Sequence, residues 1–472
     1  MQTYVQQIDA DPAWDIEVDV LVVGAGACGM AAAIAAHDAG AQVAILEKRD
    51  RAGGNSSLST GSVPGAGSRF QREAGIADSP DVMVADLLRL SGESELPELT
   101  VRMARISAEL CEWLVDNVHA RMALITDYCH VGHTIPRLHA PVSRRGQDLV
   151  DDLLAAVAER DIPLGVNNPV QTLFVDASGA VVGVAVGGPG VETSRIGARK
   201  VILASNGFAA NRELVAQYCG EIAGAEYFGA KGSEGEAVLW ARELGARLAN
   251  MEAYQGYAAV AYPHGSLLSW TTIEKGGVLV NERGERFGNE DLGYSAFARH
   301  VLAESGAVYA VFDERIKDLA SKEDEFRELV EYGGLKQADS VAALAATFKL
   351  PADAFSATLA AFNAAATGDA KDTQGRTRFG MAPLTGRLWI CRVTPGLFHT
   401  QGGLAVDNEG RVLREDGSTI AGLFAGGGAA AGISGRRGAG GYASGNGLLT
   451  AVGLGYLAGR AAAAELKEET AS

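Results

Sequence analysis

The chain has 472 residues, a formal net charge of −17 at pH 7 and 60 glycines. This length is sufficient for two domains that each bury a core. The acidic balance argues against binding to nucleic acid or to an anionic membrane surface, because both favour basic patches. The composition therefore favours a protein that works on a small molecule, and clustered glycines suggest a backbone that approaches a ligand closely.

Five cysteines are scattered along the chain without a C-x-x-C pair: Cys28, Cys111, Cys129, Cys219 and Cys391. They predict reduced thiols, with neither a disulfide framework nor a zinc site. The N-terminal stretch lacks the basic and apolar pattern of a secretory signal. The apolar run 18–36 approaches membrane-spanning length, but its glycines point to a turn instead. We expect a cytoplasmic protein with no membrane segment and no metal site.

The first strongly patterned segment runs from Asp19 to Leu46. DVLVVG is a short β-rich run, MAAAIAAHDAG is an alanine-rich helix that ends at Gly40, and AQVAILE is a second apolar run. Two apolar strands around a helix predict a βαβ unit with a right-handed crossover.

Further elements follow in order. Helical patterning resumes over 81–116 and again over 147–159. The stretch VQTLFVDASGAVVGVAVG alternates and turns at Ala177-Ser178-Gly179, which predicts a β-hairpin. KVILASNGF then predicts a buried strand that runs into a glycine turn.

From about residue 254 to residue 398 the character of the sequence changes. Glycine becomes rarer, aromatic and charged residues increase, and helical segments such as 340–348 and 352–366 alternate with short strands such as GGVLVN. The last part of the chain returns to strand, glycine loop and alanine-rich helix. We therefore interpret 254–398 as a second domain inserted into the first.

A glycine fingerprint, Gly24, Gly26 and Gly29, follows the first strand and opens the first helix. The first glycine permits a tight turn, the second lets the backbone approach a pyrophosphate, and the third lets helix and strand pack closely. The helix N-terminus offers N–H groups to phosphates. Glu47 ends the second strand, where a carboxylate can accept hydrogen bonds from ribose hydroxyls. The pattern predicts a dinucleotide-binding site.

The extended pattern after Glu47, KRDRAGGNSSLSTG, resembles the FAD-binding flavoproteins with two dinucleotide-binding domains. More specifically, the chain resembles the fumarate reductase/succinate dehydrogenase flavoprotein family, which includes the 3-ketosteroid dehydrogenases. The resemblance continues in family order through NPVQTLFVDASGAVVGV, ILASNGF, GGVLVNERGERFGNE, TPGLFHTQGGLAVD, IAGLFAGGGAAAG and SGNGLLTAVGLGYLAG. It implies an α/β fold with a Rossmann-like FAD-binding domain, split over 1–253 and 399–472. An inserted α+β capping domain would occupy 254–398.

The resemblance also implies which positions hold FAD. They lie in the fingerprint, the acidic strand end, the serine-rich loop, the later glycine turns and the start of the last helix: Gly24, Gly26, Ala27, Cys28, Gly29, Glu47, Lys48, Gly54, Asn55, Ser56, Ser59, Thr60, Gly61, Val170, Ala204, Ser205, Asn206, Gly207, Gly402, Gly427, Ser444, Asn446, Leu448 and Leu449. Relatives with covalent FAD attach it through a histidine in the serine-rich loop. Residues 53–59 contain none, so we expect non-covalent FAD. Gly427 replaces a glutamate that in many relatives holds the ribityl chain, so Asn446 or backbone amides must make those contacts.

Dicarboxylate enzymes of the family bind substrate with histidines and arginines. The H-T-x-G-G histidine is His399 here, but the cap histidine corresponds to Tyr257. The proton-donating arginine corresponds to Tyr294, and the C-terminal arginine that grips a carboxylate corresponds to Tyr442. Tyrosines at these positions, in place of histidine and arginine, resemble the pattern of the ketosteroid dehydrogenase branch.

In that branch tyrosines and a backbone N–H handle a ketone. The resemblance implies that Tyr294 is the base, and that Tyr442 with a backbone amide between Gly445 and Gly447 polarises the carbonyl. Tyr257, Tyr128 or His399 would assist the base, although a cap tyrosine is more often a packing residue. Two interpretations of Arg436 and Arg437 stay open: they bind a substrate carboxylate, or they are merely solvated.

Three further histidines, His130, His133 and His139, lack metal-ligand spacing, and we interpret them as lying at the surface or behind the site.

We expect an FAD-dependent oxidoreductase of CH–CH bonds that desaturates the bond next to a ketone. The substrate would be cyclic, a 3-oxosteroid or a smaller cyclohexanone with or without a carboxylate. The alternative is the reverse chemistry, reduction of an activated C=C bond. A third interpretation is a flavin subunit that passes electrons within a complex. The expected partners are the small-molecule substrate and an external electron acceptor, such as a quinone, oxygen or a carrier protein.

Overall fold

A computed structural model of the chain describes residues 4–8, 12–126, 129–187 and 193–471. The chain forms two compact units. The first unit comprises Met1–Cys219, Gly229–Tyr254 and His399–Ser472, and the second comprises Gly220–Phe228 and Gln255–Phe398. Residues 220–228, which the sequence expectation kept with the first part, belong to the second unit because Glu226 and Tyr227 pair with Gly396 and Leu397.

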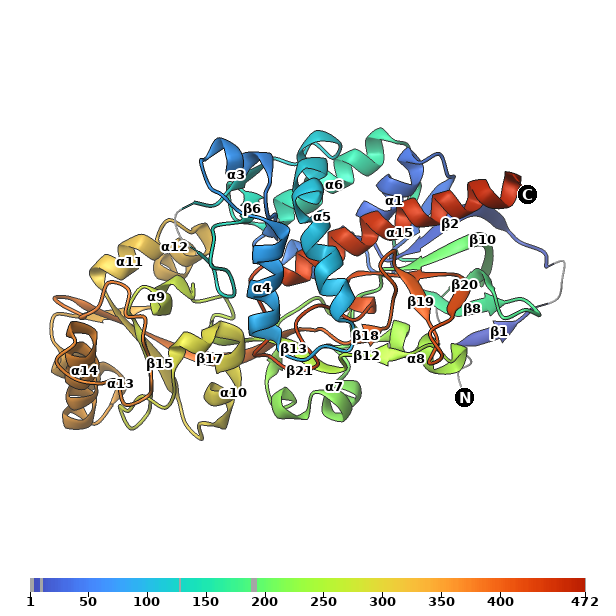
Figure 1. Ribbon diagram of the computed structural model, residues 1–472. Coiled ribbons are helices and arrows are strands. Elements are labelled where there is room, and N and C mark those ends of the chain that lie inside the picture. The colour runs from blue at the N-terminus through green and yellow to red at the C-terminus, as the bar shows by residue number, and fades with distance from the viewer. Residues whose placement is uncertain (1–3, 9–11, 127–128, 188–192, 472) are drawn as a thin grey trace. The chain divides into compact units, whose positions relative to one another are not determined.

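The first unit is built on a 9-stranded sheet (Figure 1). Five of its strands are mutually parallel, in the order β20, β10, β2, β3 and β7: Thr419–Ala425, Ser194–Leu203, Ile16–Val23, Val43–Leu46 and Leu164–Gly165. The predicted hairpin is confirmed as the antiparallel pair β8 (Val170–Val175) and β9 (Val181–Val186). The sheet also contains β1 (Val5–Gln7) and β19 (Arg411–Leu413).

Two helices pack closely against these strands and against each other: α1 (Ala27–Asp38) and α15 (Asn446–Ala471) (Figure 1). Glycines in α15 make the close approach possible. A Cβ at Gly455 would lie 2.2 Å from the Cys28 carbonyl oxygen, and one at Gly459 would lie 2.2 Å from that of Ala32. The alanine and glycine surfaces therefore hold the N-terminal end of α1 in a fixed place.

The other helices of the first unit are α2 (Gly54–Ser57), α3 (Arg69–Glu73), α4 (Pro80–Ser91), α5 (Pro97–Asp116), α6 (Gly146–Glu159), α7 (Arg212–Tyr218), α8 (Glu236–Leu244) and the 3₁₀ turn η3 (Gly427–Ala429). Its small sheets contain β4 (Val63–Pro64), β5 (Met122–Leu124), β6 (Leu138–Pro141), β12 (Leu248–Ala249) and β18 (Gly403–Leu404). The strand β21 (Arg437–Gly438) pairs with the start of β13 (Glu252–Ala261).

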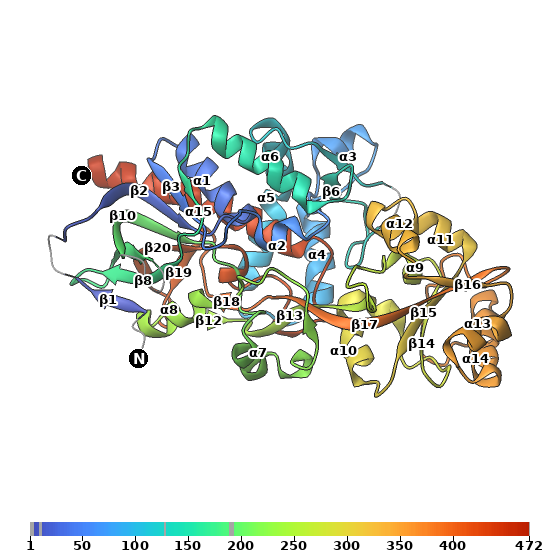
Figure 2. The same ribbon diagram turned by 180° about the vertical axis from the view of Figure 1, so that it is seen from behind.

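The second unit contains strands that pair mainly antiparallel, with one parallel pair, and helices lie around them (Figure 2). The strands are β11 (Glu226–Tyr227), most of β13, β14 (Val278–Asn281), β15 (Val308–Asp313), β16 (Lys336–Ala338) and most of β17 (Leu388–Thr400). The helical elements are η1 (Gly220–Ile222), α9 (Thr271–Glu274), η2 (Glu290–Leu292), α10 (Gly293–Ala303), α11 (Glu314–Ala320), α12 (Asp324–Glu331), α13 (Val341–Phe348) and α14 (Ala352–Thr367).

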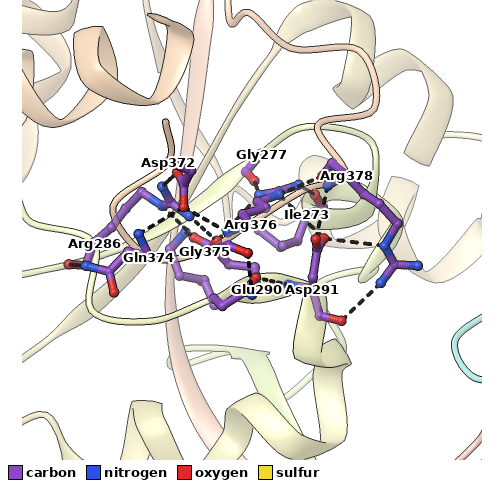
Figure 3. Close-up of polar contacts among 12 residues, drawn as sticks. Ile273, Gly277, Arg286, Glu290, Asp291, Asp372, Gln374, Gly375, Arg376 and Arg378 are labelled. Atoms are coloured by element: carbon purple, nitrogen blue, oxygen red, sulfur yellow. Dashed lines mark hydrogen bonds and ion pairs between the residues drawn. The ribbon is translucent and has the colours of Figure 1, made fainter. Parts of the chain in front are cut away.

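A buried group of charges, which we call the arginine cluster, holds the second unit together: Arg286, Glu290, Asp372 and Arg376 (Figure 3). Arg286 pairs with Glu290 at 2.6 Å and with Asp372. Arg376 is 3% exposed and donates to the carbonyl oxygens of Ile273 and Gly277, each at 2.7 Å. These bonds join segments that are distant in sequence. They also balance the charge of both buried guanidiniums and satisfy their N–H donors with carboxylates and carbonyls.

Among the described residues, α15 has the length and apolar composition of a membrane-crossing helix over Asn446–Thr470, but 83% of its most apolar stretch is buried inside the protein. The core helix of a globular protein has the same length and composition.

Candidate cofactor and substrate site

The fingerprint forms the turn between β2 and α1 in the first unit. The Gly24 N–H donates to the Leu46 carbonyl at 2.7 Å, and a Cβ at Gly24 would lie 2.4 Å from the Ala204 carbonyl oxygen. A Cβ at Gly29 would lie 1.8 Å from the Gly24 oxygen. Neither position therefore has room for a side chain, and β2, β10 and α1 meet with their backbones in contact.

The N-terminus of α1 has no side-chain cap, because its N-cap residue is Gly26. The Ala27 N–H lies 3.2 Å from the Ser56 hydroxyl oxygen, which belongs to the serine-rich loop. A helix N-terminus without a carboxylate cap favours a bound anion such as a pyrophosphate.

Glu47 lies at the C-terminal end of β3 with its carboxylate held by the backbone. It accepts hydrogen bonds from the N–H groups of Ala25 at 2.9 Å and Arg49 at 2.8 Å. Each carboxylate oxygen can accept a second bond, so the group remains able to bind ribose hydroxyls. The neighbouring Lys48 instead forms ion pairs with Glu234, at 2.9 Å, and Glu236.

The serine-rich loop is folded against its neighbours. Gly53 and Gly54 have φ of +119° and +52°, a region that favours glycine. The Asn55 side-chain oxygen accepts from the Ala230 N–H at 2.5 Å. The Ser59 hydroxyl donates to the Ser56 carbonyl at 2.7 Å and accepts from the Gly61 N–H at 3.1 Å. Thr60 and Ser62 share a hydrogen bond of 3.0 Å.

The turn after β10 contains Ser205, Asn206 and Gly207. Asn206 has φ of +67° and donates to the Ser233 hydroxyl at 2.8 Å. A Cβ at Gly207 would lie 2.3 Å from the Thr400 hydroxyl, so only glycine fits there.

The other expected cofactor positions also lie in the first unit. Cys28 is buried in α1 against Gly426 and Gly427, Gly402 abuts the backbone of Met251, and Val170 begins β8. Ser444 precedes α15, and Asn446, Leu448 and Leu449 are buried in its first turn.

Two buried polar atoms at these positions have no hydrogen-bond partner within the described part of the chain: the Ser205 hydroxyl and the Asn446 side-chain oxygen. A buried polar atom without a partner is costly, so such atoms mark places where a ligand supplies the missing bond. Together with the N–H groups at the start of α1 and the Glu47 carboxylate, they fit FAD: α1 would hold its pyrophosphate, and Ser205 and Asn446 would bond to its polar edge.

His399 and Tyr442 meet in the first unit, at the start of α15. Their rings are in T-shaped contact with centroids 5.5 Å apart. Burial raises the pKa of Tyr442 to about 12, although the Gly447 N–H donates to the phenolic oxygen. Burial lowers the pKa of His399 to about 4. Both groups are therefore neutral near pH 7, the phenol as O–H and the imidazole uncharged.

This arrangement differs from the sequence expectation in one respect. Tyr442 and a backbone amide were expected to donate side by side to one oxygen, but the Gly447 N–H donates to Tyr442 itself. Gly445 is a packing position, since its φ is +85° and a Cβ there would lie 2.7 Å from the Pro64 ring. The amide thus orients and polarises the phenol.

In the second unit, Tyr257 and Tyr294 are neighbours, with ring centroids 5.1 Å apart. The Tyr257 hydroxyl donates to the Leu268 carbonyl at 3.0 Å and accepts from the Trp270 N–H at 3.1 Å. Burial raises its pKa well above the ordinary value. Tyr257 therefore has its hydroxyl engaged with backbone. Tyr294 is half-buried on the second residue of α10.

The remaining substrate candidates are less informative. Arg436 is exposed, with Nε 3.8 Å from Glu95, and Arg437 is exposed on β21. Tyr128 lies outside the described residues. The structure describes no group of three or more His, Cys, Asp or Glu side chains that could hold a metal ion.

Of the two interpretations of the three further histidines, at the surface or behind the site, burial excludes the first for His133 and His139. His139 is 1% exposed and bonds to Ser68 at 2.9 Å, and His133 is 8% exposed, so the surface interpretation was wrong for both. His133 Nε2 lies 2.8 Å from the Ser444 carbonyl, and its Nδ1 lies 3.2 Å from Arg137. It therefore supports the loop that carries Tyr442. Sequence reasoning missed Gln401, which contacts His399, and Ser434, which contacts Gln401.

Comparison with known proteins places this geometry among flavoproteins. A family model described as an FAD binding domain matches residues 19–444. An NADH:fumarate oxidoreductase of Klebsiella pneumoniae (strain 342) is 31% identical over 94% of this chain, which spans only 47% of that relative's length. A fumarate reductase (cytochrome) of Shewanella frigidimarina is 30% identical over 94% of this chain and 77% of that relative's length. A 3-oxosteroid 1-dehydrogenase of Mycobacterium tuberculosis (strain ATCC 25618 / H37Rv) is 26% identical over 94% of this chain and 97% of its own.

Two solved structures have the same fold. The open conformation of a flavocytochrome c3 fumarate reductase has a TM-score of 0.80 and 28% identity, over 96% of this chain and 79% of that one. The 3-ketosteroid-Δ4-(5α)-dehydrogenase of Rhodococcus jostii RHA1, in complex with 4-androstene-3,17-dione, has a TM-score of 0.77 and 25% identity, over 98% of this chain and 100% of that one.

Proposed function

Because the chain belongs to the FAD-binding-domain family of CH–CH oxidoreductases, we propose that it desaturates the carbon–carbon bond next to a ketone. The family includes fumarate reductases and 3-ketosteroid dehydrogenases, and its cofactor is FAD. The proposed substrate is a cyclic ketone, a 3-oxosteroid or a smaller cyclohexanone.

The observation that carries the proposal is the pairing of Tyr442 with His399. Both are neutral near pH 7, and the Gly447 N–H supports the phenol. Preorganised neutral donors stabilise the negative charge that develops on a ketone oxygen as the α-proton leaves. A dicarboxylate would instead need a cation such as a bidentate arginine to repay its desolvation.

The remaining roles follow from the chemistry. Tyr442 donates to the ketone oxygen, and Tyr294 accepts the α-proton. The N–H groups of α1 would hold the pyrophosphate of FAD, Glu47 its ribose, and Asn446 its polar edge. The chemistry that FAD would supply there is acceptance of the hydride from the β carbon. Water must be excluded for the donors to act at full strength.

FAD is bound non-covalently, because residues 53–59 contain no histidine. The electrons leave to an external acceptor such as a quinone, oxygen or a carrier protein. A cytoplasmic location is supported by the five cysteines, all free thiols.

The reverse chemistry, reduction of an activated C=C bond, is the second candidate. The similar proteins favour it, because the relatives at 30–31% identity are named as fumarate reductases or fumarate oxidoreductases. The 3-oxosteroid 1-dehydrogenase is only 26% identical to this chain.

The test is anaerobic rapid mixing of the oxidised holoenzyme with cyclohexanone-type ketones and 3-oxosteroids, and of the photoreduced enzyme with enones and fumarate. Loss of the oxidised-flavin absorbance on mixing with a ketone supports desaturation. Fumarate oxidising the flavin as fast as the best enone would overturn the ketone assignment.

The role of Tyr294 is tested by the same anaerobic rapid-mixing experiment. Tyr294→Phe should slow flavin reduction by about 10² to 10⁴-fold with FAD retained, the usual contribution of a general base. The matched control is Tyr257→Phe, which removes a hydroxyl engaged with the backbone and should lower stability more than the rate. Flavin reduction within a few-fold of wild type in Tyr294→Phe would remove Tyr294 from this role.

A further inference from the structure

Behind His399 lies a chain of buried amides and a hydroxyl, all in the first unit. The Asn446 amide donates to the Ser434 hydroxyl oxygen at 3.3 Å, and the Ser434 hydroxyl donates to the Gln401 side-chain oxygen at 2.8 Å. The Gln401 amide nitrogen lies 2.9 Å from His399 Nδ1. Asn446, Ser434 and Gln401 are 0%, 1% and 4% exposed, so water has little access to these bonds.

The direction of this chain is set by Ser434. Its oxygen accepts from Asn446, so its single hydrogen is available for Gln401. The Gln401 oxygen therefore faces Ser434, and its NH₂ group faces His399. An Nδ1 atom that accepts a hydrogen bond carries no proton, which leaves the proton of a neutral imidazole on Nε2.

One contact favours the opposite tautomer. The Thr400 carbonyl lies 3.3 Å from Nδ1 and would accept a proton from it. The Gln401 contact is shorter, at 2.9 Å. A protonated Nδ1 would also place two donors face to face in a buried site, which is strongly unfavourable.

The Nε2 end of the ring is directed toward the same place as Tyr442. A Cβ added at Gly447 would lie 3.2 Å from His399 Nε2 and 3.2 Å from the Tyr442 hydroxyl oxygen. The Gly447 N–H already donates to that oxygen. The two side chains therefore flank one backbone position with a phenol O–H and an imidazole N–H.

We propose that Gln401 is a positioning residue that fixes His399 as the Nε2–H tautomer, so that His399 and Tyr442 form a pair of neutral donors to one substrate oxygen. The donor assignment rests on this chain's own contacts, and its meaning for substrate choice rests on the proposed function. Two neutral donors recognise a carbonyl oxygen and discriminate against a carboxylate, which needs positive charge.

The tautomer is measured directly by ¹⁵N NMR of the oxidised holoenzyme labelled at histidine, without substrate. His399 should show a protonated Nε2 and an unprotonated Nδ1. Gln401→Met removes the NH₂ donor at similar volume and should let the Nδ1–H form appear, with Thr400 as its acceptor. Gln401→Glu should bring a proton to Nδ1 as well, because the introduced carboxylate accepts from it. A wild-type ring protonated on Nδ1, or a Gln401→Met ring unchanged from wild type, would overturn the proposal.

The consequence for specificity is measured by kinetics. Gln401→Met should raise the KM for the ketone by about tenfold, the cost of one weakened hydrogen bond of about 1.4 kcal/mol. Gln401→Glu should improve the inhibition constant of succinate relative to that of the ketone product by tenfold or more, because a charged imidazole binds a carboxylate. Gln337→Met, at an exposed position of β16, is the control for introducing methionine and should change neither quantity.

If no ketone or enone is turned over, the proposed function is wrong, and the NMR experiment still decides the tautomer. If the ketone is desaturated and Gln401→Met retains the wild-type KM, the role of Gln401 in specificity is wrong while the proposed function stands.

Discussion

Two regions of the molecule treat their buried polar groups differently. Around the fingerprint of the first unit, the Ser205 hydroxyl and the Asn446 side-chain oxygen are buried without a partner among the described residues. In the arginine cluster of the second unit, Arg376 donates to two carbonyl oxygens at 2.7 Å and lies 3.6 Å from Glu290 (Figure 3). Buried polar groups are normally satisfied by protein or ligand. The first region is therefore organised to receive a molecule, whereas the second is complete and serves stability.

The two units also differ in how their stability depends on pH, and this difference is the largest effect that we expect. Burial lowers the pKa of His133 and His139 to about 4, both in the first unit. The unfolded residue titrates near 6.5. Between these values the unfolded state binds more protons, so stability is lost as the pH falls from about 6.5 to about 4, by roughly 3 kcal/mol for each histidine.

In the second unit burial raises the pKa of Glu274 to about 7. Its stabilising contribution is present below the unfolded value near 4.3 and is lost as the pH rises through 7. Burial also lowers the pKa of His300, which opposes Glu274 in part. Lowering the pH from 7 to 5 should therefore destabilise the first unit much more than the second.

Hydrogen-exchange pulse labelling in urea, with equilibration at pH 5 or pH 7 and labelling at one common pH, measures the two units separately. His139→Gln retains a donor toward Ser68 but cannot titrate, so it should reduce the pH dependence of the first unit. His264→Gln, at an exposed site, should leave it unchanged. Equal shifts in both units would contradict the prediction.

The next largest effect is expected in the arginine cluster. Arg376→Met leaves the carbonyls of Ile273 and Gly277 without their donor, and it removes one of the two guanidiniums that face the Glu290 carboxylate. Removing one partner of a buried charge network typically costs about 3–5 kcal/mol in the free energy of unfolding.

Arg378→Met is the matched control for that substitution. The Arg378 side chain is 73% exposed and lies 3.6 Å from Asp291, so its loss should cost at most about 1 kcal/mol. Urea unfolding curves of both variants decide the matter. Similar costs for the two substitutions would show that burial of the cluster contributes little.

Local patterns made much of the fold predictable. The βαβ segment, the hairpin and helices α13 and α14 are all found, because each depends on periodicity and turn residues within its own stretch. The helical region 81–116 is divided into α4 and α5, since Gly92 has φ of +61° and Pro97 starts the second helix. A resemblance of motifs, and not periodicity, indicated FAD and the tyrosines.

Contacts between distant residues were not predictable in this way. Gln401 reaches Ser434, 33 residues later, and His133 reaches Ser444, 311 residues later. Their positions follow from how strands and loops assemble, and a single sequence carries no local signal for that. The engagement of Tyr257 with Leu268 and Trp270 is of the same kind, since a cap tyrosine bonded to backbone and one facing substrate look alike in sequence.

The smallest expected effect concerns Glu47, which belongs to the region that is organised to receive a molecule. Both carboxylate oxygens already accept backbone N–H groups, those of Ala25 and Arg49. In Glu47→Gln one of these groups faces an NH₂ donor, and one acceptor for a ribose hydroxyl is lost. We expect FAD affinity to fall by about tenfold, roughly 1.4 kcal/mol.

The measurement uses apoprotein prepared by acid precipitation, followed by titration with FAD and quenching of flavin fluorescence. Lys48→Met is the informative control, because its amino group pairs with Glu234 and Glu236. It should change the FAD dissociation constant by less than threefold, whereas a direct phosphate contact would cost more. Flavin that stays with the precipitated polypeptide would refute non-covalent binding before any titration. An unchanged dissociation constant in Glu47→Gln would show that the carboxylate only shapes the turn between β2 and α1, and that the ribose is held elsewhere.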